Sequence, residues 1–394
     1  MKNLLIYMMI FLLTGCTALT EPPKNPDTGT NENPPVAEEP AEPSEPVVPE
    51  EPEDTSLFHE YKTDAAEILD TMSLEEKVGQ MFLVRCPAEE QLDSYLSMKP
   101  GGFILFGRDF VEKTKEQVIN VIEYYQKNSD IPMIIGVDEE GGTVVRVSSN
   151  PLLAEKRFKS PQELYAIGGL EEIIRDTREK SELLLSLGIN LNLAPVADVS
   201  VNKSDFIFQR AFGKDAAETA EYVKTVIQTM KDSGISSTLK HFPGYGNNVD
   251  THTGSSYDTR PYEQFVNNDF IPFKAGIESG TESILVSHNV IDAIDNKLPA
   301  SLSKNVIDIL RSNMEFTGII MTDDLSMGAI TELQTELPPE VMAVLAGNDM
   351  LIVTDFENSF TALLNAVKDG SISIERIDES VLRILKWKLY MNLM

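Results

Sequence analysis

The chain has 394 residues, a formal net charge of −30 and two cysteines. So acidic a protein argues against binding to nucleic acid or to anionic lipid, because both require clustered lysine and arginine. After Cys16, only Cys86 remains, and the apolar run around it predicts a buried thiol.

The first sixteen residues predict export and a lipid anchor. Lys2 precedes an apolar run over residues 4–13. This run is shorter than the roughly 20 residues that span a bilayer, so residues 1–15 are predicted to be a signal peptide. Leu13-Thr14-Gly15-Cys16 resembles a bacterial lipobox, which predicts lipidation of Cys16 and an extracytoplasmic protein anchored to the membrane. The alternative is an ordinary cleaved signal with an incidental cysteine.

Residues 16–56 are predicted to be a disordered tether. Within them, residues 21–54 contain ten of the 22 prolines, eleven acidic residues, one lysine and no aromatic residue. Such a segment buries too little apolar surface to offset the entropy of ordering, and its charges repel one another. The remaining residues, 57–394, are predicted to form a single catalytic domain.

Short apolar runs alternate with amphipathic stretches throughout residues 57–394. The predicted strands are residues 81–86, 102–106, 133–138, 189–196, 236–241, 283–288, 318–323 and 349–354. The predicted helices are residues 113–127, 161–187, 216–233, 262–279, 304–313, 339–346, 360–368 and 377–390. A further helix is predicted to begin after Ser73, because Ser73 and Glu76 have the spacing of a capping box. Eight such units predict an α/β fold, the (β/α)8 TIM barrel. No Gly-rich dinucleotide fingerprint follows the first strands, which weakens the Rossmann alternative.

Ionisable residues gather where the predicted strands end. They are Asp138, Asp198, Lys240, His241, His288, Asp323 and Asp355. The carboxyl ends of barrel strands form one face, which is where the active sites of such barrels lie. Any one of these residues could be a solvated loop charge, but their shared position predicts a site.

Two segments carry the candidate chemistry. In the loop after residues 236–241, Asp250 and His252 are two residues apart, so that a carboxylate can orient an imidazole that acts as general acid and base. Asp323 and Asp324 are neighbours on a strand and face opposite ways, which makes Asp323 the pocket-facing candidate and Asp324 the better candidate for a helix N-cap. By the same rule Lys240 and His241 are expected to face differently. The spacing of histidines and carboxylates matches no familiar zinc motif, so neither a metal nor a cofactor is expected.

Several motifs resemble glycoside hydrolase family 3, in particular its single-domain β-N-acetylhexosaminidase branch. The most specific are Lys240-His241-Phe242-Pro243-Gly244 and Asp250-Thr251-His252, with Val137-Asp138-Glu139-Glu140-Gly141-Gly142, Arg210-Ala211-Phe212-Gly213 and Thr322-Asp323-Asp324-Leu325 supporting them. The resemblance implies a TIM barrel and a retaining β-N-acetylglucosaminidase that acts on cell-wall fragments or related glycans. It implies that Asp323 is the nucleophile and that His252, oriented by Asp250, is the acid/base residue. It further implies that Asp138, Arg146, Arg210, Lys240 and His241 bind the terminal sugar.

The chain also departs from the family pattern. Tyr245, Thr143 and Ala211 stand where the family usually has histidine, arginine and serine, which leaves aglycone preference and loop dynamics open. Three alternatives remain: a phosphorylase that uses the same residues, a β-glucosidase or xylosidase, and a non-catalytic sugar-binding lipoprotein. The expected partners are a carbohydrate substrate and, through Cys16, a membrane; the expected oligomeric state is a monomer.

Overall fold

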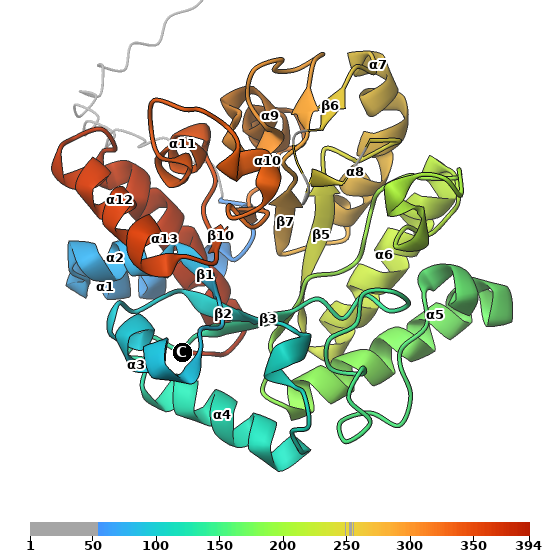
Figure 1. Cartoon of the computed structure of the whole chain (residues 1–394), viewed down its shortest axis with the longest axis horizontal. Coiled ribbons are helices and arrows are strands. Elements are labelled where there is room, and N and C mark those ends of the chain that lie inside the picture. Colours follow the sequence, from blue (N-terminus) through green and yellow to red (C-terminus); the bar gives the residue numbers. More distant parts are fainter. Residues whose placement is uncertain (1–53, 249, 252–253, 255) are drawn as a thin grey trace, which may run out of the picture. The chain divides into compact units, whose positions relative to one another are not determined.

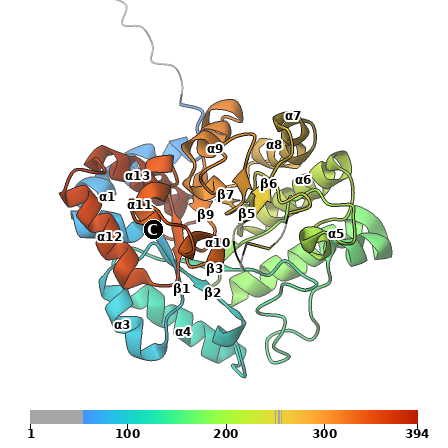
Figure 2. The ribbon, with the colours of Figure 1, turned by 45° about the horizontal axis from the view of Figure 1, so that its top comes forward.

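The computed structural model describes residues 54–394 except 249, 252–253 and 255, and Glu53–Met394 form one compact unit. The predicted lipidation site Cys16, the signal peptide and nearly all of the tether lie outside the described residues. Helices surround a central set of parallel strands (Figures 1 and 2).

The eight predicted strands are all present and pair in parallel, in the order β10-β1-β2-β3-β4-β5-β7-β9. They are β1 (Phe82–Arg85), β2 (Gly102–Leu105), β3 (Ile134–Val137), β4 (Leu191–Asn192), β5 (Ser236–Phe242), β7 (Ser283–Val286), β9 (Ile319–Thr322) and β10 (Leu351–Val353). A parallel bridge between Met321 and Met350 joins the two ends of this order. The sheet is therefore closed, which confirms the predicted (β/α)8 barrel.

The strands are buried on both faces, as expected when helices cover a parallel sheet. Every residue of β2, β3, β7 and β9 is buried. Strand β4 is shorter than predicted, because Pro195 cannot donate a hydrogen bond to a ladder. The chain nevertheless continues alongside β5, where Thr238 N donates to Ala194 O (3.1 Å) and Lys240 N donates to Pro195 O (3.2 Å).

The helices form the outer layer, and each predicted helix is observed. The α-helices are α1 (Lys62–Thr71), α2 (Leu74–Gln80), α3 (Glu89–Ser97), α4 (Lys115–Lys127), α5 (Pro161–Ser186), α6 (Ala216–Ser233), α7 (Tyr262–Gln264), α8 (Phe270–Glu278), α9 (Lys304–Asp308), α10 (Gly328–Thr331), α11 (Pro339–Ala346), α12 (Phe356–Lys368) and α13 (Ile374–Tyr390). Two π-helical turns, η5 (Phe265–Asp269) and η7 (Ile309–Asn313), continue α7 and α9. The 3-10 turns are η1 (His59–Tyr61), η2 (Gly107–Asp109), η3 (Phe206–Gln209) and η6 (Ala300–Leu302).

Local signals explain some boundaries but not others. The predicted capping box is present before α2: Glu76 N donates to Ser73 Oγ (3.3 Å) and Ser73 N donates to Glu76 Oε2 (2.8 Å). Helix α3 was not predicted, because charged and polar residues dominate its sequence. A small parallel sheet of β6 (Tyr257–Asp258) and β8 (Val290–Ile291) was also missed, since two-residue strands show no periodicity.

Cys86 is buried, as predicted, and burial raises the pKa of its thiol to about 11. Among residues 54–394, apart from the four internal positions named above, no helix has the length and hydrophobicity of a membrane span.

Candidate active site

One cavity of about 370 Å³ lies at the carboxyl ends of the barrel strands. Six of the residues predicted for the site line it: Asp138, Arg146, Arg210, Lys240, His241 and Asp323. They come from the ends of β5 and β9, the segments that follow β3, and the turn η3. Residues separated by up to 185 positions thus meet around one space, as the strand-end rule predicts.

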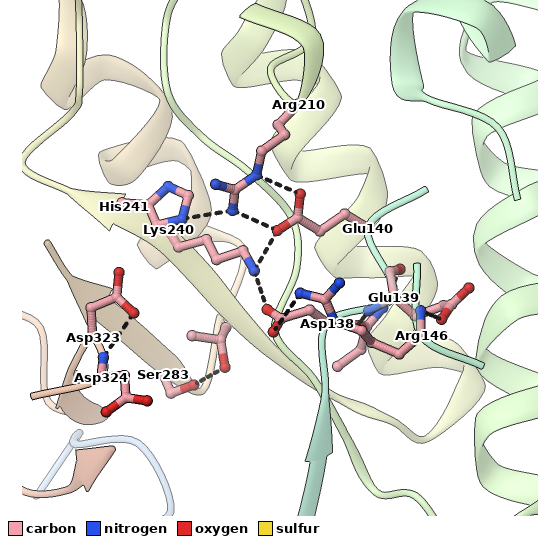
Figure 3. Close-up of polar contacts among 12 residues, drawn as sticks. Asp138, Glu139, Glu140, Arg146, Arg210, Lys240, His241, Ser283, Asp323 and Asp324 are labelled. Atoms are coloured by element: carbon pink, nitrogen blue, oxygen red, sulfur yellow. Dashed lines mark hydrogen bonds and ion pairs between the residues drawn. The ribbon is translucent and has the colours of Figure 1, made fainter. Parts of the chain in front are cut away.

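A chain of alternating charges lies at one wall of the cavity, and all of its members except Glu140 line that cavity (Figure 3). Lys240 Nζ lies 2.6 Å from both Asp138 Oδ1 and Glu140 Oε1. Arg210 donates to the same glutamate through Nε (3.0 Å to Oε2) and Nη2 (2.8 Å to Oε1). Arg146 is at the end of this chain, with Nη2 3.9 Å from Asp138 Oδ2. The carboxylate of Glu140 therefore orients both Lys240 and Arg210.

The electrostatics of this group follow from burial and pairing. Burial alone would raise the pKa of Glu140, but the positive charges of Arg210 and Lys240 outweigh it and place that pKa well below its ordinary range. Burial likewise opposes the charge on Arg210, and the Glu140 carboxylate overcomes that effect and raises the pKa of Arg210. Both side chains are thus charged at neutral pH, and their geometry is fixed before any ligand binds.

Asp198 orients His241 from behind the cavity wall. Asp198 Oδ2 accepts hydrogen bonds from His241 Nδ1 (2.7 Å) and from His241 N (3.1 Å). Arg210 Nη2 lies 2.9 Å from His241 Nε2. Because a guanidinium can only donate, Nε2 is the acceptor and the ring is neutral, with its proton on Nδ1. Asp198 also accepts from Tyr245 N (2.7 Å), so it orients two residues that line the cavity.

The expectation that Lys240 and His241 face different ways is wrong. Both side chains line the same cavity. The register between β5 and β7 shifts at this point: Lys240 pairs with Leu285, and Phe242, two residues on, pairs with Val286. His241 is the extra residue of this irregularity, and such bulges redirect a side chain that would otherwise alternate away.

Asp323 and Asp324 follow β9, and both line the cavity. Asp323 N donates to Val286 O (2.9 Å), which continues the barrel ladder, and Asp323 Oδ1 accepts from Asp324 N (2.8 Å). The prediction that Asp324 caps a helix is wrong. Its Oδ1 accepts from Ser326 N (2.9 Å) and its Oδ2 from Thr354 Oγ1 (2.9 Å), so it closes a turn before α10 begins.

The predicted acid/base pair is only partly described. Asp250 is half-buried and does not line the cavity, and His252 lies outside the described residues. Thr251, between them in the sequence, is fully buried, and its hydroxyl lies 2.6 Å from that of Tyr245. The structure thus places one neighbour of His252 beside a residue that lines the cavity.

Residues 73–387 match the glycosyl hydrolase family 3 N terminal domain. The chain belongs to glycosyl hydrolase family 3. The Beta-hexosaminidase LpqI of Mycobacterium tuberculosis is 28% identical over 338 residues, which are 82% of this chain and 85% of that protein. A Beta-hexosaminidase of Hydrogenovibrio crunogenus is 33% identical over 294 residues, or 70% of this chain and 78% of the relative. The structure of a glycoside hydrolase family 3 beta-N-acetylglucosaminidase from Paenibacillus sp. str. FPU-7 aligns with a TM-score of 0.75 and 29% sequence identity. The alignment covers 82% of this chain and 63% of the Paenibacillus chain.

Two residues of this family 3 site, Glu140 and Arg85, were not predicted from the sequence as site residues. Glu140 stood in a quoted motif without a role, although it contacts both Lys240 and Arg210. Arg85 ends β1 and lines the cavity, with Cζ 4.4 Å from the centre of the Phe106 ring. The strand-end rule would have found Arg85, had it been applied to the first strand.

Besides Asp198, two strand-end residues lie outside the cavity lining. His288 is fully buried, and its Nδ1 lies 2.7 Å from Ser301 Oγ and its Nε2 3.0 Å from Asp324 O. Asp355 is the N-cap of α12 and accepts from Asn358 N (3.3 Å). Both therefore support neighbouring segments. No group of three or more histidines, cysteines or carboxylates suited to a metal is found in the part of the chain that the structure describes.

Proposed function

We propose that this chain is a retaining, exo-acting β-N-acetylglucosaminidase that removes terminal N-acetylglucosamine from cell-wall fragments or related glycans. One observation carries the proposal. The carboxylate of Asp323 shares a cavity of about 370 Å³ with a preorganised set of hydrogen-bonding groups from β3, β5 and η3. The volume is within the range of small-ligand sites. The relatives named beta-hexosaminidase support the substrate class.

The charged chain on the cavity wall suits recognition of a sugar. Asp138 can accept from sugar hydroxyls, while Lys240 and Arg210 can donate to hydroxyl or amide oxygens. Their mutual contacts fix each side chain before the sugar arrives. Binding therefore costs little side-chain entropy, and a neutral substrate suits a wall whose charges are already paired.

The chemistry then proceeds in two displacements at the anomeric carbon. In the first, an Asp323 carboxylate oxygen bonds to that carbon, the glycosidic C–O bond breaks, and the leaving oxygen takes the proton of His252. In the second, a water oxygen attacks the same carbon, its proton passes to His252, and Asp323 leaves as a carboxylate. Asp250 would orient the imidazole, as a carboxylate does in other acid/base pairs.

The test is hydrolysis of 4-nitrophenyl N-acetyl-β-D-glucosaminide by the unmodified enzyme and by Asp323→Ala and His252→Ala. Each substitution is expected to abolish turnover, and full activity in either would overturn that residue's role. Inorganic phosphate should leave the product unchanged; a sugar 1-phosphate would identify a phosphorylase instead. The matching glucoside should be a poor substrate, and binding of N-acetylglucosamine without any turnover would indicate a sugar-binding protein.

We further propose that the enzyme is a monomer held at the extracytoplasmic face of a membrane through a lipid on Cys16. The lipobox-like Leu13-Thr14-Gly15-Cys16 and the acidic, proline-rich segment after it support this. The Cys16→Ser protein should move from the membrane fraction to the soluble fraction with its activity retained. Membrane retention of that variant would exclude the anchor, and sedimentation of the released enzyme would report its oligomeric state.

A further inference from the structure

The side chain of Tyr245 connects two parts of the site. It is 1% exposed and lines the cavity, and its hydroxyl oxygen lies 2.6 Å from Thr251 Oγ1. Thr251 is 0% exposed, so both hydroxyls are shielded from bulk solvent. A hydrogen bond between two such hydroxyls is costly to lose, because the remaining group stays buried without its partner.

Tyr245 is also fixed from its other side. Its backbone N–H donates to Asp198 Oδ1 (2.7 Å), and the other oxygen of this carboxylate accepts from His241 Nδ1 (2.7 Å). The rings of Tyr245 and His241 meet edge to face, with centroids 5.2 Å apart and planes at 88°. The sugar-binding imidazole and the phenol therefore share one anchor and one packing contact.

The phenol of Tyr245 keeps its proton at neutral pH. Burial, reinforced by the negative charge of Asp323, raises the pKa of Tyr245 well above its ordinary value. The protonated hydroxyl is therefore available as a hydrogen-bond donor or acceptor toward Thr251.

We propose that Tyr245 is a positioning residue for the acid/base step, because it fixes Thr251, the residue between Asp250 and His252 in the sequence, beside the group proposed to bind the sugar around His241. This inference rests on the proposed function, in which His252 protonates the leaving group. Thr251 is the immediate sequence neighbour of both members of the proposed acid/base pair. Small errors in the placement of a catalytic group cost much more rate than the contact itself is worth, roughly 100-fold for 1 Å.

The experiment compares leaving groups. For a retaining enzyme, kcat/KM reports the steps up to formation of the glycosyl-enzyme. A 2,4-dinitrophenyl leaving group needs almost no protonation, whereas the second sugar of chitobiose needs it fully. Tyr245→Phe removes only the hydroxyl, Thr251→Val removes its partner, and Thr251→Ser is the matched control that retains the hydroxyl.

Tyr245→Phe and Thr251→Val are each expected to lower kcat/KM for chitobiose about tenfold or more, and for the dinitrophenyl glycoside less than threefold. Thr251→Ser should resemble the unmodified enzyme, and the double variant should lose no more than either single variant. Equal losses on the two substrates, or no loss on chitobiose, would overturn the positioning role. Failure of the proposed function is a separate result, because the unmodified enzyme would then hydrolyse neither substrate.

Discussion

Replacing Glu140 with glutamine removes the carboxylate that contacts both Lys240 and Arg210. Its oxygens lie 2.6 Å from Lys240 Nζ and 2.8–3.0 Å from the Arg210 guanidinium, and Glu140 and Lys240 are almost fully buried. Removing one partner of a buried ion pair costs about 3–5 kcal/mol of unfolding free energy. Glutamine retains one acceptor oxygen, so we expect a loss of about 2–4 kcal/mol at pH 7.

The pH dependence gives an independent check on the same residue. The pKa of Glu140 is lower in the folded protein than its ordinary value of 4.5. The group therefore contributes its full stabilisation above pH 4.5 and loses it as the pH falls toward the folded pKa. Between pH 4.5 and 3 the unmodified protein should lose about 1 kcal/mol per pH unit through this group, and Glu140→Gln should lack that component.

The assay is urea unfolding at pH 7 and at several values below 4.5, together with kcat/KM for the 4-nitrophenyl substrate. We expect kcat/KM to fall roughly 100-fold, because Lys240 and Arg210, the two cations proposed to bind the sugar, lose their orientation. Glu123→Gln is the matched control, since Glu123 is exposed on α4. If Glu140→Gln and Glu123→Gln show the same stability and the same kcat/KM, the proposed role of the buried charge chain is wrong.

Two further predictions concern the scaffold. Lys388 is fully buried, with Nζ 2.6 Å from Gln80 Oε1, and burial lowers its pKa from 10.5 to about 7. Between these two pH values the unfolded chain binds a proton that the folded protein does not, so the free energy of unfolding should rise with pH from about 7 to about 10. Urea titrations should show that Lys388→Met lacks this rise, whereas the exposed-site control Lys115→Met keeps it. In Gly276→Ala the new Cβ would lie 2.5 Å from Leu239 Cδ2, which should destabilise the packing of α8 on β5 by about 1–3 kcal/mol; an unchanged thermal midpoint would contradict this.

Sequence periodicity predicted the barrel well because its strands are covered on both faces. Uninterrupted apolar runs mark such strands, and the ionisable residue that ends a run is visible without any three-dimensional information. This is why Asp138, Lys240 and Asp323 were found. The two-residue strands of the β6–β8 sheet and the polar helix α3 carry no such pattern.

The side-chain directions were less predictable, since they depend on irregular backbone. Alternation predicts that Lys240 and His241 diverge, but the register shift between β5 and β7 brings both to the cavity. Likewise, Asp198 follows a predicted strand but does not line the cavity. Its two carboxylate oxygens accept hydrogen bonds from His241 and Tyr245, so it orients these residues instead. Whether a polar residue contacts the ligand or orients another residue is decided by such tertiary contacts.

In the proposed mechanism, Asp323 bonds covalently to the sugar during turnover. The test is to incubate the enzyme with an activated 5-fluoro N-acetyl-β-D-glucosaminide, which keeps the 2-acetamido group and slows the second displacement, and to locate the label by peptide mass spectrometry. We expect one sugar per chain, attached to Asp323, with simultaneous loss of activity. A label on another residue, or continued turnover of the neutral substrate by a fully labelled protein, would contradict it.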